Sequence, residues 1–126
     1  MKIRIQDGLA YVTLNVTYQR KRLRLERVLL DTGSAGTLLA TDKVLEIGVQ
    51  LEPHDTIHRI RGVGGAEFVF MKCFEMVACD EIVLENFEVE VGAMQYGLDL
   101  DGILGLDFLL QVGATIDLAQ LEIYAQ

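Results

Sequence analysis

The chain has 126 residues, of which 51% are hydrophobic, and its formal net charge is −8. This length suits one folded domain with a real core, and we expect a single domain over residues 1–126. The negative charge argues against nucleic acid and anionic membrane surfaces as partners, because both repel such a chain.

No secretion or membrane signal stands out in the sequence. The N-terminal residues contain no long apolar run with a cleavage site, and no stretch approaches the roughly 20 apolar residues that cross a bilayer. We therefore expect a cytoplasmic protein with no membrane partner. Cys73 and Cys79 fall in strand-like sequence, where even spacing predicts one shared face and a separation of about 20 Å. This predicts two reduced, partly buried thiols and no disulfide.

The first third of the chain alternates polar and apolar residues, as β-strands do. This alternation covers residues 2–5, and it resumes over 9–18 after a hairpin turn signal at Asp7 and Gly8. A solvated turn is then predicted at a basic cluster, which consists of Arg20, Lys21, Arg22 and Arg24, and a third strand is predicted over 23–30. The continuous apolar run that ends this strand predicts burial on both of its faces.

The remaining elements follow the same pattern. A short strand over 37–40 leads into a short helix that Thr41 is expected to cap and that continues to about Ile47, with Gly48 in the C′ position. Further strands are expected from about 57 to 61 and over 66–79, 82–91, 114–116 and 121–124, with a helical turn at 106–110. These elements predict a mostly β fold, a small closed β-barrel with one or two short helices.

Asp31 stands at the end of a predicted buried strand, which is an unusual place for a carboxylate. Removing such a charge from water without a partner costs several kcal/mol. The following Thr32, Gly33 and Ser34 predict a tight turn in which backbone N–H groups and hydroxyls bond the carboxylate. An isolated Asp-Thr-Gly also fits an ordinary Asx turn or helix cap, so the tripeptide alone does not decide its role.

Two further features accompany this motif. The run Gly62, Val63, Gly64 and Gly65 lies between two strand-like segments and indicates the tip of a hairpin. Ile103 begins an apolar-apolar-glycine run ahead of the short final helix. With these features in this order and spacing, the sequence resembles the retropepsin family, the retroviral-type aspartic peptidases, over nearly its whole length.

The resemblance implies an aspartic endopeptidase that hydrolyses extended peptides or unfolded protein segments without a metal or other cofactor. The family's reaction needs two carboxylates, and this chain contains one Asp-Thr-Gly. The resemblance therefore implies a homodimer in which two copies of Asp31 form a dyad on the two-fold axis. One carboxyl would be ionised and activate a water, and the other would be protonated and polarise the scissile carbonyl.

The resemblance also implies a role for each neighbour of Asp31. Thr32 would hydrogen-bond across the dimer, Gly33 would give backbone access to the substrate, and Ser34 would bond the outer carboxylate oxygen. The apolar-apolar-glycine element would pack behind this loop.

Substrate binding is expected at the flap, the hairpin tipped by residues 62–65, which would close over a peptide bound by β-strand addition. Ile103 completes the expected substrate-binding set. Leu38 and Ile60 are interpreted as pocket residues or as ordinary core residues.

Two features leave the function open. The family commonly joins its subunits through interleaved termini, and residues 121–124 suit that role but also fit an ordinary edge strand. Arg59 and Arg61 flank the flap where apolar residues are expected, and we interpret them mainly as solubilising charges. A catalytically silent peptide-binding or dimerisation module is therefore the alternative to a peptidase.

Other candidate sites are weaker. His54 and His58 have the spacing of a zinc pair on a helix, but Pro53 favours extended chain, in which the two side chains lie apart. Asp101 is expected to face solvent. Asp107 is expected to cap or orient the short final helix without a catalytic role.

Overall fold

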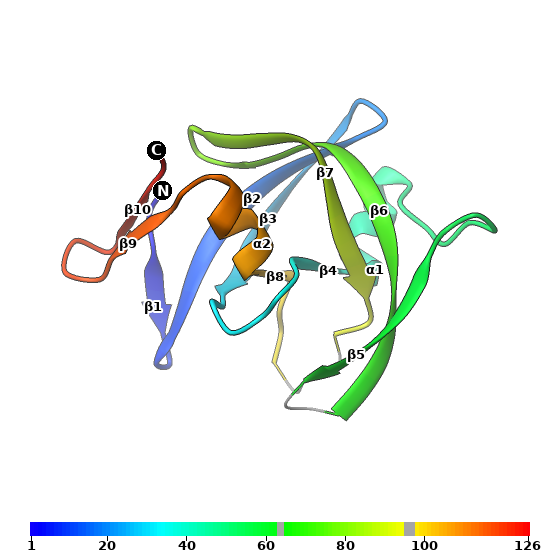
Figure 1. Ribbon diagram of the computed structural model, residues 1–126, viewed down its shortest axis with the longest axis horizontal. Helices are drawn as coiled ribbons and strands as arrows, with labels where there is room; N and C mark the ends of the chain where they lie inside the picture. The colour runs from blue at the N-terminus through cyan, green and yellow to red at the C-terminus, as the bar shows by residue number, and fades with distance from the viewer. Residues whose placement is uncertain (63–64, 95–97) are drawn as a thin grey trace.

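The computed structural model describes residues 1–62, 65–94 and 98–126, and most of its elements are strands (Figure 1). The strands are β1 (Arg4–Gln6), β2 (Leu9–Tyr18), β3 (Lys21–Leu30), β4 (Leu38–Ala40), β5 (Ile57–Gly62), β6 (Gly65–Cys79), β7 (Ile82–Gly92), β8 (Gly102–Leu104), β9 (Thr115–Asp117) and β10 (Glu122–Tyr124). The helices are α1 (Thr41–Val44), the 3-10 turn η1 (Leu45–Ile47) and α2 (Leu106–Gln111). The expected cap is wrong, since Thr41 is the first helical residue and Ala40, which has no polar side chain, is the N-cap. No helix in these described ranges is long and apolar enough to cross a membrane.

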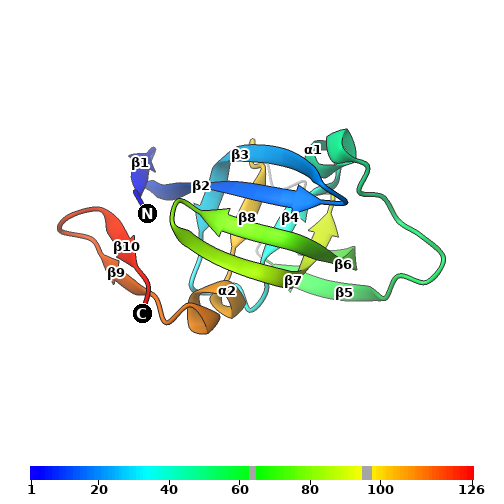
Figure 2. The same cartoon turned by 90° about the horizontal axis from the view of Figure 1, so that it is seen from above.

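Strands β1 to β8 form one sheet that curls back on itself. Its order is β1-β2-β3-β8-β4-β7-β6-β5, and an additional pairing of β2 with β6 joins the central strands into a ring. Figures 1 and 2 show these strands arranged around a common interior, with β9 and β10 set to one side. The predicted mostly β fold is confirmed, and the ring of strands is the form that its closure takes.

Apolar side chains fill the interior of the ring. The alternation predicted over 9–18 is confirmed in β2, where Val12, Leu14 and Val16 are fully buried. α2 contributes Phe108 to this interior. The phenyl groups of Phe108 and Phe87 meet edge to face, with their centroids 5.8 Å apart. Removing each such side chain from water contributes about 1.5–3 kcal/mol, so this core supplies the main driving force for folding.

The basic cluster lies mostly in a strand and only partly in a turn, which corrects the prediction. β3 begins at Lys21, and the hairpin turn consists of Gln19 and Arg20, with φ of 48° and 69°. Positive φ at both positions is typical of a two-residue loop of type I′, whose conformation matches the twist of the flanking strands. The charged side chains of this strand are exposed at its start.

The two cysteines differ in exposure, although the even spacing predicted a shared face. Cys73 is exposed and Cys79 is buried, and both are free thiols. β6 pairs with β5 over its first part and with β2 near its end, so its inward positions shift between Phe74 and Val77. Burial, and then the nearby Asp80, raise the pKa of Cys79 to about 12, which keeps this thiol protonated and unreactive.

Candidate active site

The loop that carries Asp31 begins between strands that come from distant parts of the chain. β3 pairs in parallel with β8, with Leu30 opposite Leu104, and β4 pairs with β8 on its other side. The N–H of Asp31 continues the first pairing by donating to the carbonyl of Leu104 at 3.0 Å. The backbone of Asp31 is therefore fixed by the sheet, while its side chain projects from the end of the strand.

The predicted tight turn around the carboxylate is confirmed. The N–H of Gly33 donates to Oδ1 of Asp31 at 2.9 Å, and the N–H of Ser34 donates to the Asp31 carbonyl at 3.2 Å. A Cβ at Gly33 would stand 3.2 Å from the same carboxylate oxygen, so glycine suits this close approach. Asp31 is half-buried, whereas Thr32 and Gly33 are exposed, and the turn therefore presents its surface to solvent.

The expected hydrogen bond from Ser34 to the carboxylate is wrong for the single chain. The Ser34 hydroxyl donates to the carbonyl of Gly36 at 2.8 Å. A hydroxyl has one hydrogen, so the bond to the Gly36 carbonyl leaves none for the carboxylate of Asp31. The bond from Thr32 across a dimer stays a prediction.

The apolar-apolar-glycine element packs directly behind this loop, as predicted. A Cβ at Gly105 would overlap the carbonyl of Gly36, so only glycine allows the two backbones to approach this closely. The next two N–H groups, of Leu106 and Asp107, donate to the carbonyls of Ser34 and Ala35 at 2.7 and 3.2 Å. The start of α2 therefore holds the Asp31 loop, the candidate catalytic loop, in place.

Thr37 and Asp107 form a second brace, which sequence reasoning missed for Thr37. Thr37 is fully buried; its hydroxyl donates to Oδ1 of Asp107 at 2.7 Å and accepts from the N–H of Gly105 at 3.1 Å. The N–H of Thr37 donates to Oδ2 of Asp107 at 3.2 Å. The same carboxylate accepts from the N–H of Phe108 at 2.7 Å, so Asp107 orients the first turn of α2 from within the helix, while the N-cap, Gly105, makes no side-chain bond. A polar residue opening an apolar strand was the signal available for Thr37.

Asp101 does not face solvent, which corrects the prediction. Its Oδ2 accepts from the N–H groups of Glu26 and Arg27 at 3.2 and 3.1 Å, and its side chain is 13% exposed. Lys43 lies 3.7 Å from its other oxygen. Because β8 begins just after Asp101 and runs beside β3, the carboxylate reaches the backbone of β3 ahead of the catalytic loop.

The expected substrate-binding residue Ile103 lies in a small apolar cluster apart from the main core. Leu38 and Ile60 belong to the same cluster, so all three predicted pocket residues come together. Their neighbours in this cluster come from β2, β3, β4 and β6, and from the segment between β7 and β8. Ile103 points to this cluster while its neighbour Leu104 points into the main core, as alternation along β8 requires.

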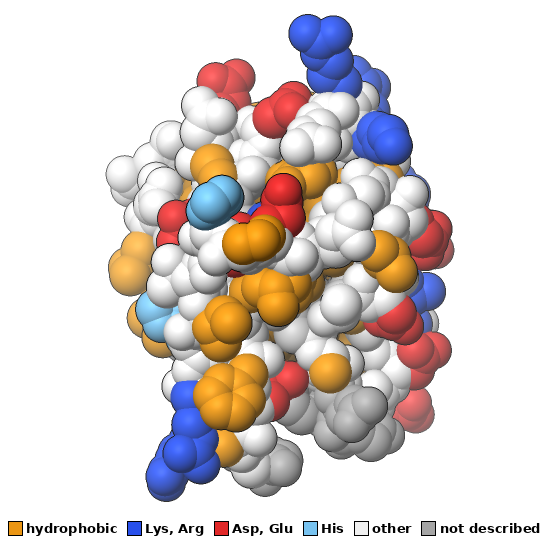
Figure 3. Space-filling view, turned by 90° about the vertical axis from the view of Figure 1, so that its right-hand side faces the viewer, with side chains coloured by type: hydrophobic (Ala, Val, Ile, Leu, Met, Phe, Trp, Pro, Cys, Tyr) orange, Lys and Arg blue, Asp and Glu red, His pale blue; other side chains and the backbone are white. Residues whose placement is uncertain are grey.

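The flap is a long hairpin made by β5 and β6. Gly62 lies opposite Gly65, whose φ of 110° favours glycine, and the predicted tip residues Val63 and Gly64 lie outside the described residues. Figure 3 shows hydrophobic side chains gathered on the face of the molecule that the flap lines, with basic side chains at its edge. Phe68 is 71% exposed there, so the hairpin presents apolar surface to solvent.

Glu90 places a carboxylate beside the catalytic loop. A Cβ at Gly36 would overlap its side chain, and its N–H donates to the carbonyl of Thr37 at 2.9 Å. Burial raises the pKa of Glu90, and the negative charges of Asp107 and Glu67 raise it further, while His58 opposes them. The wall of the site next to Gly36 is therefore acidic and only partly hydrated.

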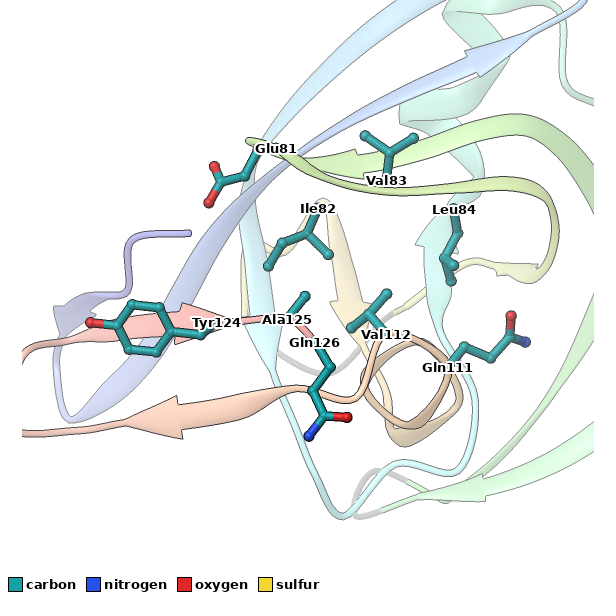
Figure 4. A pocket seen from close by; sticks show the side chains of 9 residues that line it. All are labelled: Glu81, Ile82, Val83, Leu84, Gln111, Val112, Tyr124, Ala125 and Gln126. Carbon is teal, nitrogen blue, oxygen red and sulfur yellow. The ribbon is translucent and has the colours of Figure 1, made fainter.

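A hollow of about 480 Å³ lies away from this loop, between the start of β7, the end of α2 and the C-terminal residues (Figure 4). Ile82, Leu84 and Val112 supply its apolar wall. It does not contain Asp31 and offers no nucleophile or paired carboxylates. Over the described part of the chain, no group of three or more His, Cys, Asp or Glu side chains is placed to hold a metal ion.

Comparison with known proteins agrees with this geometry. A family model for aspartyl proteases matches residues 14–108, which include the catalytic loop and the glycine behind it. The crystal structure of a retropepsin-like aspartic protease from Rickettsia conorii has a similar fold, with a TM-score of 0.64 and 20% sequence identity over 92% of this chain and 82% of that chain. No curated protein sequence matches the chain. The chain therefore belongs to the aspartyl protease family, as a retropepsin-like member.

Proposed function

We propose that this protein is an aspartic endopeptidase that acts as a homodimer, with one Asp31 from each subunit in the active site. The observation that carries the proposal is the loop itself. Its carboxylate projects from the end of β3, bonded by the N–H of Gly33 and braced by Gly105 and Asp107. A charged group held this firmly at an exposed turn is suited to chemistry with a second molecule.

The proposed reaction uses the two carboxyls in different protonation states. Two carboxyls within hydrogen-bond reach do not both ionise, and they titrate as a pair, a behaviour for which aspartic proteases are a general example. The ionised Asp31 takes a proton from a water molecule, and the oxygen of that water adds to the scissile carbonyl carbon. The protonated Asp31 gives its proton to the carbonyl oxygen. Collapse of this tetrahedral species, with proton transfer to the amide nitrogen, breaks the C–N bond.

The proposed substrate is an extended peptide or an unfolded protein segment. The flap hairpin supplies strand backbone to pair with such a segment, and the cluster of Ile103, Leu38 and Ile60 supplies apolar surface for alternate side chains. The exposed Arg59 and Arg61 on the same hairpin are the observation that favours the alternative, a module that binds peptides without cutting them.

Cleavage of a diverse peptide mixture, read by mass spectrometry, tests the proposal. Wild type and Asp31→Asn are compared at high protein concentration from acidic to neutral pH, because monomers carry half a site. We expect cuts that are present with wild type and absent with the variant, a loss of at least about a thousandfold in rate. The bonds between Thr37 and Asp107 are untouched by this substitution, so circular dichroism should show an unchanged fold.

A folded, dimeric wild type that makes no Asp31-dependent cut at any pH would contradict the peptidase. Retained binding of the same peptides by that protein would then support the binding module.

A further inference from the structure

The chain builds a small sheet from its own two ends. β10 pairs with β9, with Ile123 opposite Ile116, and on its other side it meets the N-terminal residues through a bridge between Lys2 and Glu122. Ile123 donates to the carbonyl of Met1 at 2.8 Å, and the amino group of Met1 donates back to the Ile123 carbonyl at 3.2 Å. β10 is therefore bonded on both sides by its own chain, to β9 on one side and to the N-terminal residues on the other.

This arrangement leaves no room for a partner's strand beside β10. Interleaved termini require a free edge on the terminal strand, and both edges of β10 are occupied by the same chain. Met1, Ile3 and Ile123 are also buried in the main core, so these contacts belong to the folded subunit. A dimer of this protein must be joined at another place.

The open edge of the terminal sheet is β9. In an antiparallel pair, the N–H and C=O of one residue point to the same side, and this side alternates along the strand. Ile123 directs both groups toward Met1 and so away from β9. Ile116, which lies opposite it, therefore directs its N–H and C=O away from β10, to an edge where no described strand is paired.

We infer that two copies of this chain join edge to edge through β9, with Ile116 on the two-fold axis; this inference rests on the proposed dimeric function. In such a pair, Ile116 and the partner's Ile116 each donate to the other's carbonyl, which makes the contact self-complementary. Thr115 lies opposite the partner's Asp117, so a carboxylate faces a hydroxyl and like charges do not face each other. β9 carries neither lysine nor proline, the residues that commonly protect a free edge.

The position of β9 fits a shared active site. α2 holds the catalytic loop at its N-terminal end through Leu106 and Ser34, and β9 follows directly after it. Figures 1 and 2 show α2 between the catalytic loop and β9 on the same side of the molecule. Leu118, just beyond β9, is 67% exposed and would be covered by a second copy. Pairing at β9 joins the β9–β10 sheets of the two subunits into one sheet across the dimer.

Two substitutions at Ile116 separate the edge from the side chain. Both variants lose the isoleucine side chain. Ile116→Pro also removes the outward N–H, whereas Ile116→Ala keeps that N–H. Sedimentation and dilution assays should show the dimer of the proline variant weakened at least about tenfold relative to the alanine variant, since two intersubunit hydrogen bonds are lost. Equal dimer affinity of the two variants would overturn the inference.

Cysteine pairs test the register even if the proline variant does not fold. In a Cys73→Ser background, chains with Thr115→Cys are mixed with chains carrying Asp117→Cys and oxidised. Opposite positions lie about 4.5 Å apart at Cα, within disulfide range, so the mixture should give a covalent dimer that neither chain gives alone. Cys79 is buried and does not interfere.

The outcomes distinguish the inference from the proposed function. Absence of the mixed disulfide, or a wild type that is monomeric at all concentrations, would overturn pairing at β9. A mixed disulfide in a protein that shows no Asp31-dependent cleavage would leave the interface established and contradict the peptidase.

Discussion

The side-chain carboxylate of Asp107 accepts three hydrogen bonds. The N–H and hydroxyl of Thr37 and the N–H of Phe108 all point at its carboxylate, at 3.2, 2.7 and 2.7 Å. An ionised carboxylate is the side chain that accepts all of these bonds at once. Through Thr37, this single residue fixes the exit of the catalytic loop against α2.

Replacement of Asp107 tests this brace. In Asp107→Asn the amide NH2 faces an N–H donor of Thr37 or Phe108, so the loop should shift and kcat should fall about 10- to 100-fold with KM little changed. Thr37→Ser keeps the hydroxyl and should retain most of kcat, which makes it the matched control. Steady-state kinetics with thermal unfolding separate this effect from simple loss of stability. A wild-type kcat for Asp107→Asn would contradict a positioning role.

The flap is anchored at its base by an ion pair on β6. Lys72 is 5% exposed, and its Nζ lies 2.9 Å from a carboxylate oxygen of Asp55 and also bonds Glu52, both in the loop ahead of β5. Burial by itself would lower the pKa of Lys72, but the bonds to Asp55 and Glu52 raise it above its ordinary value. The bond from Lys72 in turn lowers the pKa of Asp55. The loop and the hairpin are thus held together by charge at one point.

The pH dependence of this anchor follows from these two shifts. A lowered Asp55 pKa gives stability that is present above the ordinary carboxyl range and lost as the pH falls through the folded value. A raised Lys72 pKa gives stability that is present below its ordinary range and lost only at strongly alkaline pH. Thermal unfolding of Lys72→Met at pH 7 should show a midpoint lower by about 3–6 °C, and this difference should shrink below roughly pH 4.

Glu52→Gln is the matched control for the anchor. Its side chain is 57% exposed, so its loss should lower the midpoint by less than the loss of Lys72. A Lys72→Met protein as stable as wild type from pH 4 to pH 9 would contradict the anchoring role.

At the scale of the whole molecule, the turn that carries Asp31 lies on the surface of the single chain. The catalytic turn is exposed and the strands around it form one wall, so the opposite wall must come from another molecule if the proposed reaction occurs. The main core and the terminal sheet are complete within one chain. In the proposed dimer, folding of the subunit and assembly of the site are therefore separate steps.

Mixing subunits tests this separation. If activity needs two copies of Asp31, a ninefold excess of Asp31→Asn should leave about one tenth of the activity per wild-type chain, because mixed dimers carry one catalytic carboxyl. The measurement is cleavage rate after equilibration of the mixture, and an equal excess of an unrelated folded protein is the control. Unchanged activity would show that single chains, or partners other than this chain, complete the site.

The sequence by itself determined the features that depend on residues close together in the chain. Alternation set the inward face of β2, positive-φ glycine set the end of the first helix at Gly48, and the Asp31 turn followed from its three neighbours. The resemblance carried by the motifs predicted the family correctly. Glycine is needed where two backbone segments approach closely, so the spacing of these glycines can be read in the sequence. Local conformation and local spacing are properties that a sequence shows directly.

Only the tertiary structure decided which distant groups meet. Thr37 bonds Asp107 seventy positions away, and Asp101 bonds the backbone of Glu26 across a similar distance in sequence. Neither pairing has a local signal, because a hydrogen-bond partner is chosen by the order of strands in the sheet and not by periodicity. The same holds for β10, which local sequence describes only as a strand. Its central place, and the open edge this leaves on β9, follow from the way the two ends of the chain meet.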